Sequence, residues 1–192
     1  MDLLSLFGRV NHPRFAHPLR TRRTTVVLEP LFRRERNVIH VDPALPGAAA
    51  EVAALRPAVV AGSFERLISL APELDSPPTH AVVVLTREGG RQIGEADRDR
   101  LWRAYHVPVF EQVVDAAGRL IAWECEAHDG LHLAATARAE GVTVIEENTC
   151  ACGQHGPRVT GPRVATVLSA VFGTGMLPAP EPLASRGRPI PT

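Results

Sequence analysis

The chain has 192 residues, of which 45% are hydrophobic, and its 21 basic and 21 acidic residues give a formal net charge of zero. A chain of this length can bury a sizeable core, so we expect one domain over residues 1–175. No stretch reaches 18 apolar residues and the start is too short for a signal peptide, which argues against membrane spanning and export. An odd cysteine count excludes a disulfide framework, and we expect a cytoplasmic protein.

All the basic residues are arginines, because the sequence contains no lysine. Such a bias is typical of GC-rich bacterial genomes. The absence of lysine means that these residues contain no Schiff-base lysine, no Walker-type phosphate lysine and no lysine general base. The most arginine-rich stretch, residues 9–36, favours a solvated surface or a partner contact over nucleic-acid binding.

Short apolar runs alternate with helical patterns as far as residue 113, which predicts an α/β fold with a mostly parallel sheet and crossover helices. Strands are predicted at residues 24–28, 37–41, 58–61, 81–85 and 107–113. Helices are predicted at residues 47–55, 63–71 and 94–105. Around the last of these helices we expect Ile93, Leu101 and Trp102 to face the core.

The C-terminal part is expected to form a small β element held by a metal. A strand at residues 119–124 pairs with the preceding strand through a turn at 115–118, and another strand is predicted at 142–145. A last helix is predicted at 162–172. The Pro, Gly and small residues that follow predict a flexible tail over residues 176–192.

All three cysteines lie within 28 residues, and with one histidine they give the spacing Cys125-x6-His132-x17-Cys150-x-Cys152. Soft thiolates and a neutral imidazole are ligands that tetrahedral Zn²⁺ prefers. Four protein ligands leave no open coordination position, which is typical of a structural rather than a catalytic ion. The pattern therefore predicts a Zn²⁺ site presented by two strand ends.

Other interpretations of these residues remain open at this point. His128 or His155 can replace His132 as the nitrogen ligand, and the cysteines can instead be small buried hydrophobic side chains. Glu124 or Glu126 beside a zinc-bound water would be a general base in a hydrolase. That last chemistry needs an open position on the metal.

Four segments carry a resemblance to known enzymes. They are Leu55–Ser63, Val107–Gln112, Glu124–His132 and Cys150–Gly153, the last followed by Pro157-Arg158. Over about residues 50–160 the chain resembles the central α/β region of phenylacetate-CoA ligase-like adenylate-forming enzymes. The Glu-Cys…Gly-Leu-His and Cys-x-Cys-Gly segments bind zinc in members of that family. The resemblance thus implies the fold of that subdomain, with Cys125, His132, Cys150 and Cys152 as the zinc ligands.

The chain departs from the family where ATP is bound. The Ser/Thr/Gly-rich phosphate loop is not found, and Val113–Ala117 replaces the family's Tyr-Gly-x-Thr-Glu segment. The C-terminal domain that brings a catalytic lysine is also not found. Stabilising phosphate charge is most of what such an enzyme contributes to the transfer. The resemblance therefore implies a shortened relative that keeps the scaffold and the zinc site without the ATP chemistry.

These observations favour a zinc-binding, non-catalytic accessory protein. It would act by binding a protein partner or a second copy of itself, or by retaining a pocket for an acyl or aryl molecule. The main alternative is one subunit of a split adenylate-forming acyl/aryl-CoA ligase. A zinc-dependent hydrolase is the less favoured alternative.

Overall fold

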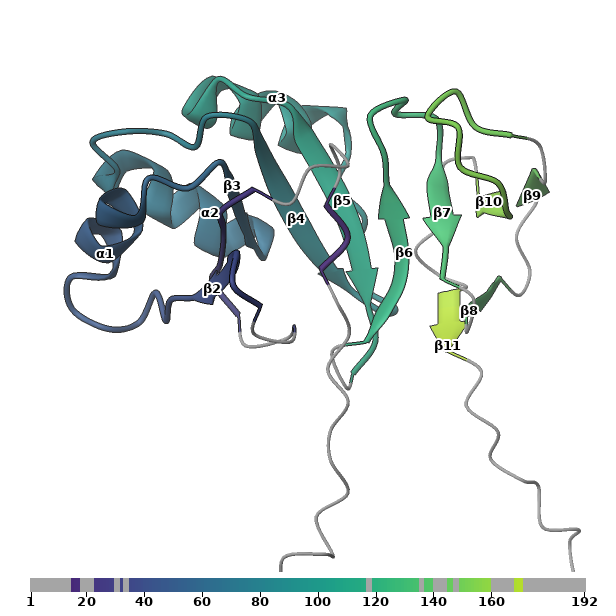
Figure 1. The fold of residues 1–192 in the computed structure, drawn as a ribbon, viewed down its shortest axis with the longest axis horizontal. Coiled ribbons are helices and arrows are strands. Elements are labelled where there is room, and N and C mark those ends of the chain that lie inside the picture. The colour runs from purple at the N-terminus through teal and green to yellow at the C-terminus, as the bar shows by residue number, and fades with distance from the viewer. Residues whose placement is uncertain are drawn as a thin grey trace, which may run out of the picture.

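The computed structural model describes residues 15–17, 23–29, 32, 35–116, 119–134, 137–139, 145–146, 149–159 and 168–170. Within these residues, nine strands form one sheet in the order β2-β1-β3-β4-β5-β6-β7-β10-β9 (Figure 1). A second sheet pairs β11 (Leu168–Ala170) with β8 (Ala137–Ala139) in antiparallel fashion.

One half of the large sheet is parallel. It contains β2 (Val38–His40), β1 (Thr25–Val27), β3 (Val59–Gly62), β4 (Ala81–Arg87) and β5 (Val109–Val114). Three helices connect these strands in turn: α1 (Ala48–Leu55), α2 (Phe64–Leu70), which continues into a short 3₁₀ turn at Ala71–Glu73, and α3 (Glu95–Tyr105). The prediction of an α/β fold with crossover helices is confirmed.

The two faces of the parallel half are covered differently. Strand residues such as Val26, Val60 and Val82 pack with the buried residues of all three helices. The alternate residues pack instead with Phe15 and Phe32 of the N-terminal segment. Because side chains alternate across a strand, uniformly apolar strands are needed where both faces are buried.

Trp102 corrects one prediction about the core. Ile93 and Leu101 are buried as expected, but Trp102 is 56% exposed. The buried stripe of α3 runs through Leu101 and Tyr105, which lie one turn apart, so Trp102 points away from the sheet. The Tyr105 hydroxyl donates a 2.5 Å hydrogen bond to the Leu67 carbonyl and joins α3 to α2.

The other half of the large sheet is antiparallel. It contains β6 (Leu120–Glu124), β7 (Leu131–Leu133), β10 (Arg158–Val159) and β9 (Ile145–Glu146). The predicted pairing of β5 with β6 is confirmed. Strands β7 and β10 were not predicted, because two or three residues are too few to show an alternating pattern.

The C-terminal predictions have mixed outcomes. Of the predicted strand at 142–145 only residue 145, the start of β9, is described. Within the predicted helix at 162–172, residues 168–170 form β11, so the helix is wrong there, because pairing with β8 outweighs the local pattern. The tail at 176–192 lies outside the described residues, and the domain boundary at 175 stays a prediction.

The described helices are short, and α3 has 11 residues. Among the described residues, no helix has the length and apolar character needed to cross a membrane.

The corrected orientation of α3 can be tested by a pair of alanine substitutions. Leu101→Ala opens a cavity against the sheet and should lower the free energy of unfolding by about 2–5 kcal/mol. Trp102→Ala removes an exposed side chain and should change it by less than about 1 kcal/mol. Urea unfolding of both variants measures the difference, and a larger loss for Trp102→Ala would contradict the orientation.

Candidate functional site: a metal centre and an adjoining pocket

The four residues of the predicted metal site come from neighbouring strands of the antiparallel half. Cys125 directly follows β6, as predicted, whereas His132 is the middle residue of β7. Cys150 and Cys152 lie in the loop that precedes β10, the strand that pairs with β7. Residues 27 positions apart in the chain are therefore brought to one place by sheet pairing.

The ligand atoms of these four residues form a compact buried group. All of them lie within 4.8 Å of one another. The Sγ atoms of Cys125 and Cys150 are 3.6 Å apart, and Cys152 Sγ lies 3.4 Å from His132 Nε2. Bonds of about 2.3 Å to sulfur and about 2.0 Å to nitrogen in a tetrahedron predict separations of about 3.8 Å and 3.6 Å. These two separations are therefore close to those in a tetrahedral metal site, and the four residues could hold a metal ion.

Backbone hydrogen bonds fix the conformation of the Cys-x-Cys loop, which carries two of the three thiols. The Gly153 N–H donates a 2.7 Å hydrogen bond to the Cys150 carbonyl, and the Gln154 N–H lies 3.4 Å from Cys152 Sγ. Gly153 has φ of 76°, a left-handed conformation that favours glycine. The left-handed backbone conformation thus explains why glycine follows the second cysteine.

A buried arginine lies beside the thiols. Arg158, 3% exposed, places Nη1 2.6 Å from Asp129 Oδ2 and 3.5 Å from Cys150 Sγ. Three thiolates, one neutral imidazole and Zn²⁺ carry a net charge of about −1, which a guanidinium compensates. Sequence reasoning gave Arg158 no role, although it lies in a segment that carried the family resemblance.

The thiols differ in acidity. Burial raises the pKa of Cys125 to about 12. Burial also acts to raise the pKa of Cys150, but hydrogen bonds from the Cys152 N–H and from the neighbouring thiols, with the charge of Arg158, lower it overall. A metal ion must therefore displace protons from this group as it binds.

The two alternative histidines make other contacts. His128 Nδ1 lies 2.9 Å from Glu124 Oε1, and its ring stacks on Phe110 with centroids 4.7 Å apart. His155 Nδ1 lies 3.0 Å from Thr149 Oγ1 on the exposed side of the loop. Of the three histidines, His132 is the one that the geometry places with the cysteines.

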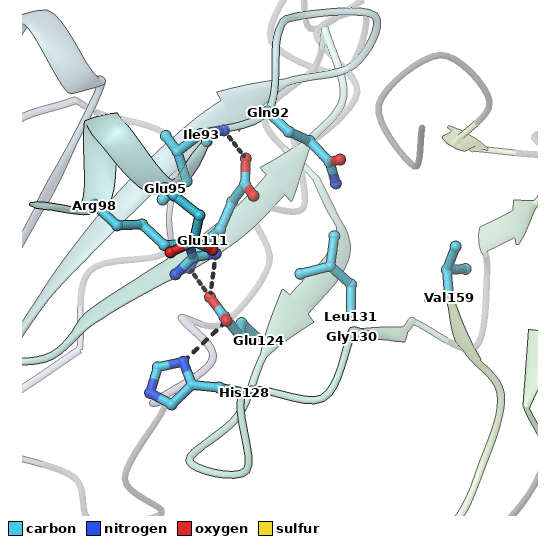
Figure 2. A pocket seen from close by; sticks show the side chains of 11 residues that line it. Gln92, Ile93, Glu95, Arg98, Glu111, Glu124, His128, Gly130, Leu131 and Val159 are labelled. Atoms are coloured by element: carbon cyan, nitrogen blue, oxygen red, sulfur yellow. Dashed lines mark hydrogen bonds and ion pairs between the residues drawn. The ribbon is translucent and has the colours of Figure 1, made fainter. Parts of the chain in front are cut away.

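A cavity of about 710 Å³ is lined in part by residues that lie between Cys125 and His132 in the chain (Figure 2). The start of α3, strands β5 and β6, and the loop between Cys125 and His132 form its walls. That loop contributes His128 and Gly130, and the start of β7 contributes Leu131. The metal centre and the cavity therefore share one segment of chain.

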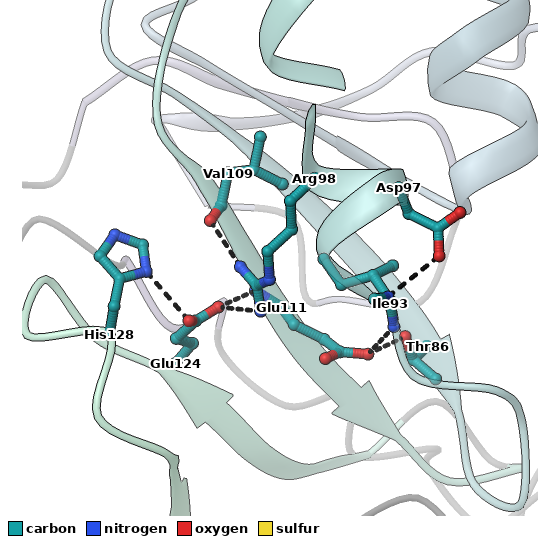
Figure 3. A network of polar contacts seen from close by, with 9 residues as sticks. Thr86, Ile93, Asp97, Arg98, Val109, Glu111, Glu124 and His128 are labelled. Carbon is teal, nitrogen blue, oxygen red and sulfur yellow. Dashed lines mark hydrogen bonds and ion pairs between the residues drawn. The ribbon is translucent and has the colours of Figure 1, made fainter. Parts of the chain in front are cut away.

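A network of polar contacts centred on Glu124 forms one side of the cavity (Figure 3). Glu124 Oε2 accepts hydrogen bonds of 3.0 Å from Arg98 Nη2 and from the Glu111 N–H. Its other oxygen faces His128 Nδ1. Arg98 also donates to the Val109 carbonyl at 3.0 Å. Both oxygens of Glu124 and two nitrogens of Arg98 are thus engaged.

Glu111 is a second buried carboxylate in the same cavity, and it is 2% exposed. Its Oε1 accepts hydrogen bonds from Thr86 Oγ1 at 2.5 Å and from the Ile93 N–H at 3.3 Å. Burial raises the pKa of Glu111, and the bond from Thr86 only partly offsets this. Sequence reasoning placed Glu111 in a strand and missed the site. The sequence feature that could have identified Glu111 is the presence of an acidic residue inside an apolar run.

Among the comparisons with known proteins, the one with solved structures finds a similar fold. No family model and no curated protein sequence matches the chain. A solved structure of 2-hydroxyisobutyryl-CoA ligase in an open conformation, with 2-HIB-AMP and CoA, matches with a TM-score of 0.51 at 14% identity, over 71% of this chain and 43% of the ligase. The same ligase in its postadenylation state with R3-HIB-AMP matches with a TM-score of 0.51 at 13% identity, over 75% and 43%.

The similarity shows that the chain has part of an acyl-CoA ligase fold. The chain spans less than half of the ligase's length. The finer resemblance to phenylacetate-CoA ligases is not resolved by these matches.

The choice of ligands can be tested by metal content. Cys152→Ser and His132→Ala each remove one ligand, so the purified variants should lose bound zinc and about 3 kcal/mol or more of unfolding free energy. His128→Ala and His155→Ala serve as controls and should keep one zinc per chain. Atomic absorption with urea unfolding measures both quantities, and zinc retained in Cys152→Ser together with unchanged stability would contradict the site.

The burial of Glu111 predicts a pH-dependent stability. Because its pKa is raised in the folded chain, its contribution to stability is complete below the unfolded pKa and is lost as the pH rises through the folded pKa. Glu111→Gln removes this loss, so it should raise the unfolding free energy at pH 7 by on the order of 1 kcal/mol. The gain should shrink towards about pH 5. Urea unfolding at both pH values measures it, and a gain that grows as the pH falls would contradict the assignment.

Proposed function

We propose that this chain is a zinc-stabilised α/β binding protein, related to the phenylacetate-CoA ligase-like enzymes, whose residues do not carry out adenylation by themselves. One observation carries the proposal: four protein ligand atoms, all buried, lie within 4.8 Å of one another in a Cys₃His set. Such a set closes the coordination sphere of Zn²⁺. The metal then acts on folding, and the function lies in what the rest of the surface binds.

The position of the ligands supports a structural role. Strands β9 and β10 contain two residues each, so each forms few of the hydrogen bonds that hold it in the sheet. A zinc ion that joins Cys125 and His132 to the loop before β10 would hold these strands in register. Metal-binding free energy at a site of this kind is folding free energy.

The end of β5 and the turn that follows it support the absence of ligase chemistry. Val113 and Val114 are buried in the strand, and the carboxylate of Asp115 is paired with Arg119 across the turn. These residues stand where the related enzymes have Tyr-Gly-x-Thr-Glu. The 192 residues also supply no lysine. These residues therefore supply neither the glutamate of that segment nor the lysine that the related enzymes use on the nucleotide.

A subunit of a split adenylate-forming ligase is the second candidate. The observation behind it is the match to 43% of 2-hydroxyisobutyryl-CoA ligase, because these residues correspond to one part of such an enzyme. A zinc-dependent hydrolase is less well supported, because four protein ligands leave no position for a reactive water. In the binding role, the ligand is a protein partner, a second copy of the chain or a small molecule.

The test combines metal analysis with an adenylation assay. The purified chain should contain one zinc and lose thermal stability when a chelator removes it. It should show no ATP–pyrophosphate exchange with phenylacetate or 2-hydroxyisobutyrate. Exchange by the chain alone would overturn the non-catalytic proposal, and chelation without loss of stability would overturn the structural role of zinc.

A further inference from the structure

We propose that the cavity between α3, β5 and β6 binds a small organic cation, through an amidinium or ammonium group that donates a hydrogen bond to Glu111 Oε2. This goes beyond the proposed function, which leaves the ligand open. It rests on that function in one respect: the zinc would hold the loop from Cys125 to His132, which forms a wall of the cavity.

The charges around the cavity favour a cation over an anion. Glu95, Glu111 and Glu124 line it together with one guanidinium, that of Arg98. Arg98 is already paired with Glu124 and with the Val109 carbonyl. A carboxylate or phosphate placed here would face an excess of negative charge at low dielectric.

The backbone donors at the start of α3 are also engaged. The Ile93 N–H donates to Glu111 Oε1, and the Gly94 N–H donates to Asp97 Oδ2 at 3.0 Å. A helix start can bind an anion when its N–H groups are free. Here side chains of the protein already occupy these two donors.

Glu111 is the residue that points to a ligand. It is 98% buried, and both hydrogen bonds to its carboxylate go to Oε1 (Figure 3). Among the described residues, none donates a hydrogen bond to Oε2, and Glu111 lines the cavity. Oε2 therefore faces the cavity without a donor from these residues, and a cation placed there can give it a charge-assisted hydrogen bond. The raised pKa of Glu111 agrees with this, because a cation that binds there would stabilise the ionised form.

The rest of the cavity suits an apolar body attached to the cation. Figure 2 shows Leu131 and Val159 across the cavity from the carboxylates, and Ile93 beside Glu111. Arg98 and His128 also line a smaller hollow of about 230 Å³ that reaches the exposed Trp102. A flat ring between these apolar and aromatic groups would place an amidinium at Glu111.

A metal ion fits the cavity less well than an organic cation. Both oxygens of Glu124 are engaged, so Glu111 Oε2 and the exposed Glu95 are the carboxylate groups left for coordination. Mg²⁺ and Ca²⁺ require about six or more oxygen ligands. An amidinium or ammonium group needs only one acceptor oxygen, and Glu111 Oε2 can supply it.

The test uses three probes that share a ring and differ in charge: benzamidine, benzamide and benzoate. Calorimetric titration of the zinc-loaded full chain should show benzamidine binding at least about tenfold more tightly than benzamide, with no binding of benzoate. Glu111→Gln should remove this preference. Glu95→Gln, an exposed variant that leaves the core intact, should weaken benzamidine binding by about two- to fivefold. Asp75→Asn, remote and exposed, is the control for net charge and should leave it unchanged.

Several results would overturn the proposal. These are equal affinity for benzamidine and benzamide, no binding of benzamidine, a preference for benzoate, or a preference that survives in Glu111→Gln. Stronger binding of Mg²⁺ alone than of benzamidine would replace the organic cation by a metal. Zinc content is measured in every sample. A chain that holds one zinc but binds benzamidine and benzamide equally well rejects only this inference. A zinc-free chain that binds benzamidine through Glu111 rejects only the proposed function.

Discussion

The Cys₃His group is the constraint on which the antiparallel half of this protein depends. Strands β7, β9 and β10 are too short to hold a sheet edge by hydrogen bonds and side-chain packing alone. The thiols of Cys125, Cys150 and Cys152 and the imidazole of His132 meet where these strands and their loops converge. One tetrahedral ion there would add four metal bonds to the small apolar cluster of this half, and the buried Arg158 would balance their charge.

The cavity depends on the same segment of chain. His128, Gly130 and Leu131 lie between two metal ligands, so the position of that wall follows from the position of Cys125 and His132. On the facing side, Arg98 ties α3 to β5 and β6 through Val109 and Glu124. Helix α3 and the loop between two candidate metal ligands thus border a group of carboxylates, of which Glu111 keeps one oxygen towards the open space.

The parallel half of the fold could be predicted from local patterns, because each of its strands is an apolar run long enough to recognise. Ala81–Leu85 is the clearest case and forms most of β4. The short strands could not be predicted, since two or three residues carry no periodicity. Trp102 was misplaced because a few residues of apolar pattern leave the buried stripe of a helix uncertain by one position. The strand Leu168–Ala170 could not be predicted either, because it forms by pairing with β8, which lies much earlier in the chain.

The sequence by itself determined the chemistry of the candidate metal centre: three thiols, nearby histidines and the Cys-x-Cys-Gly turn are local features. The tertiary structure brings His132, rather than His128 or His155, close to the cysteines, because alternate residues of a strand point to opposite faces and the pairing of β7 with β10 selects the face. The cavity was likewise decided in three dimensions. Arg98, Glu111, Glu124 and His128 come from a helix, two strands and a loop, and no spacing in the chain brings them together before the sheet forms.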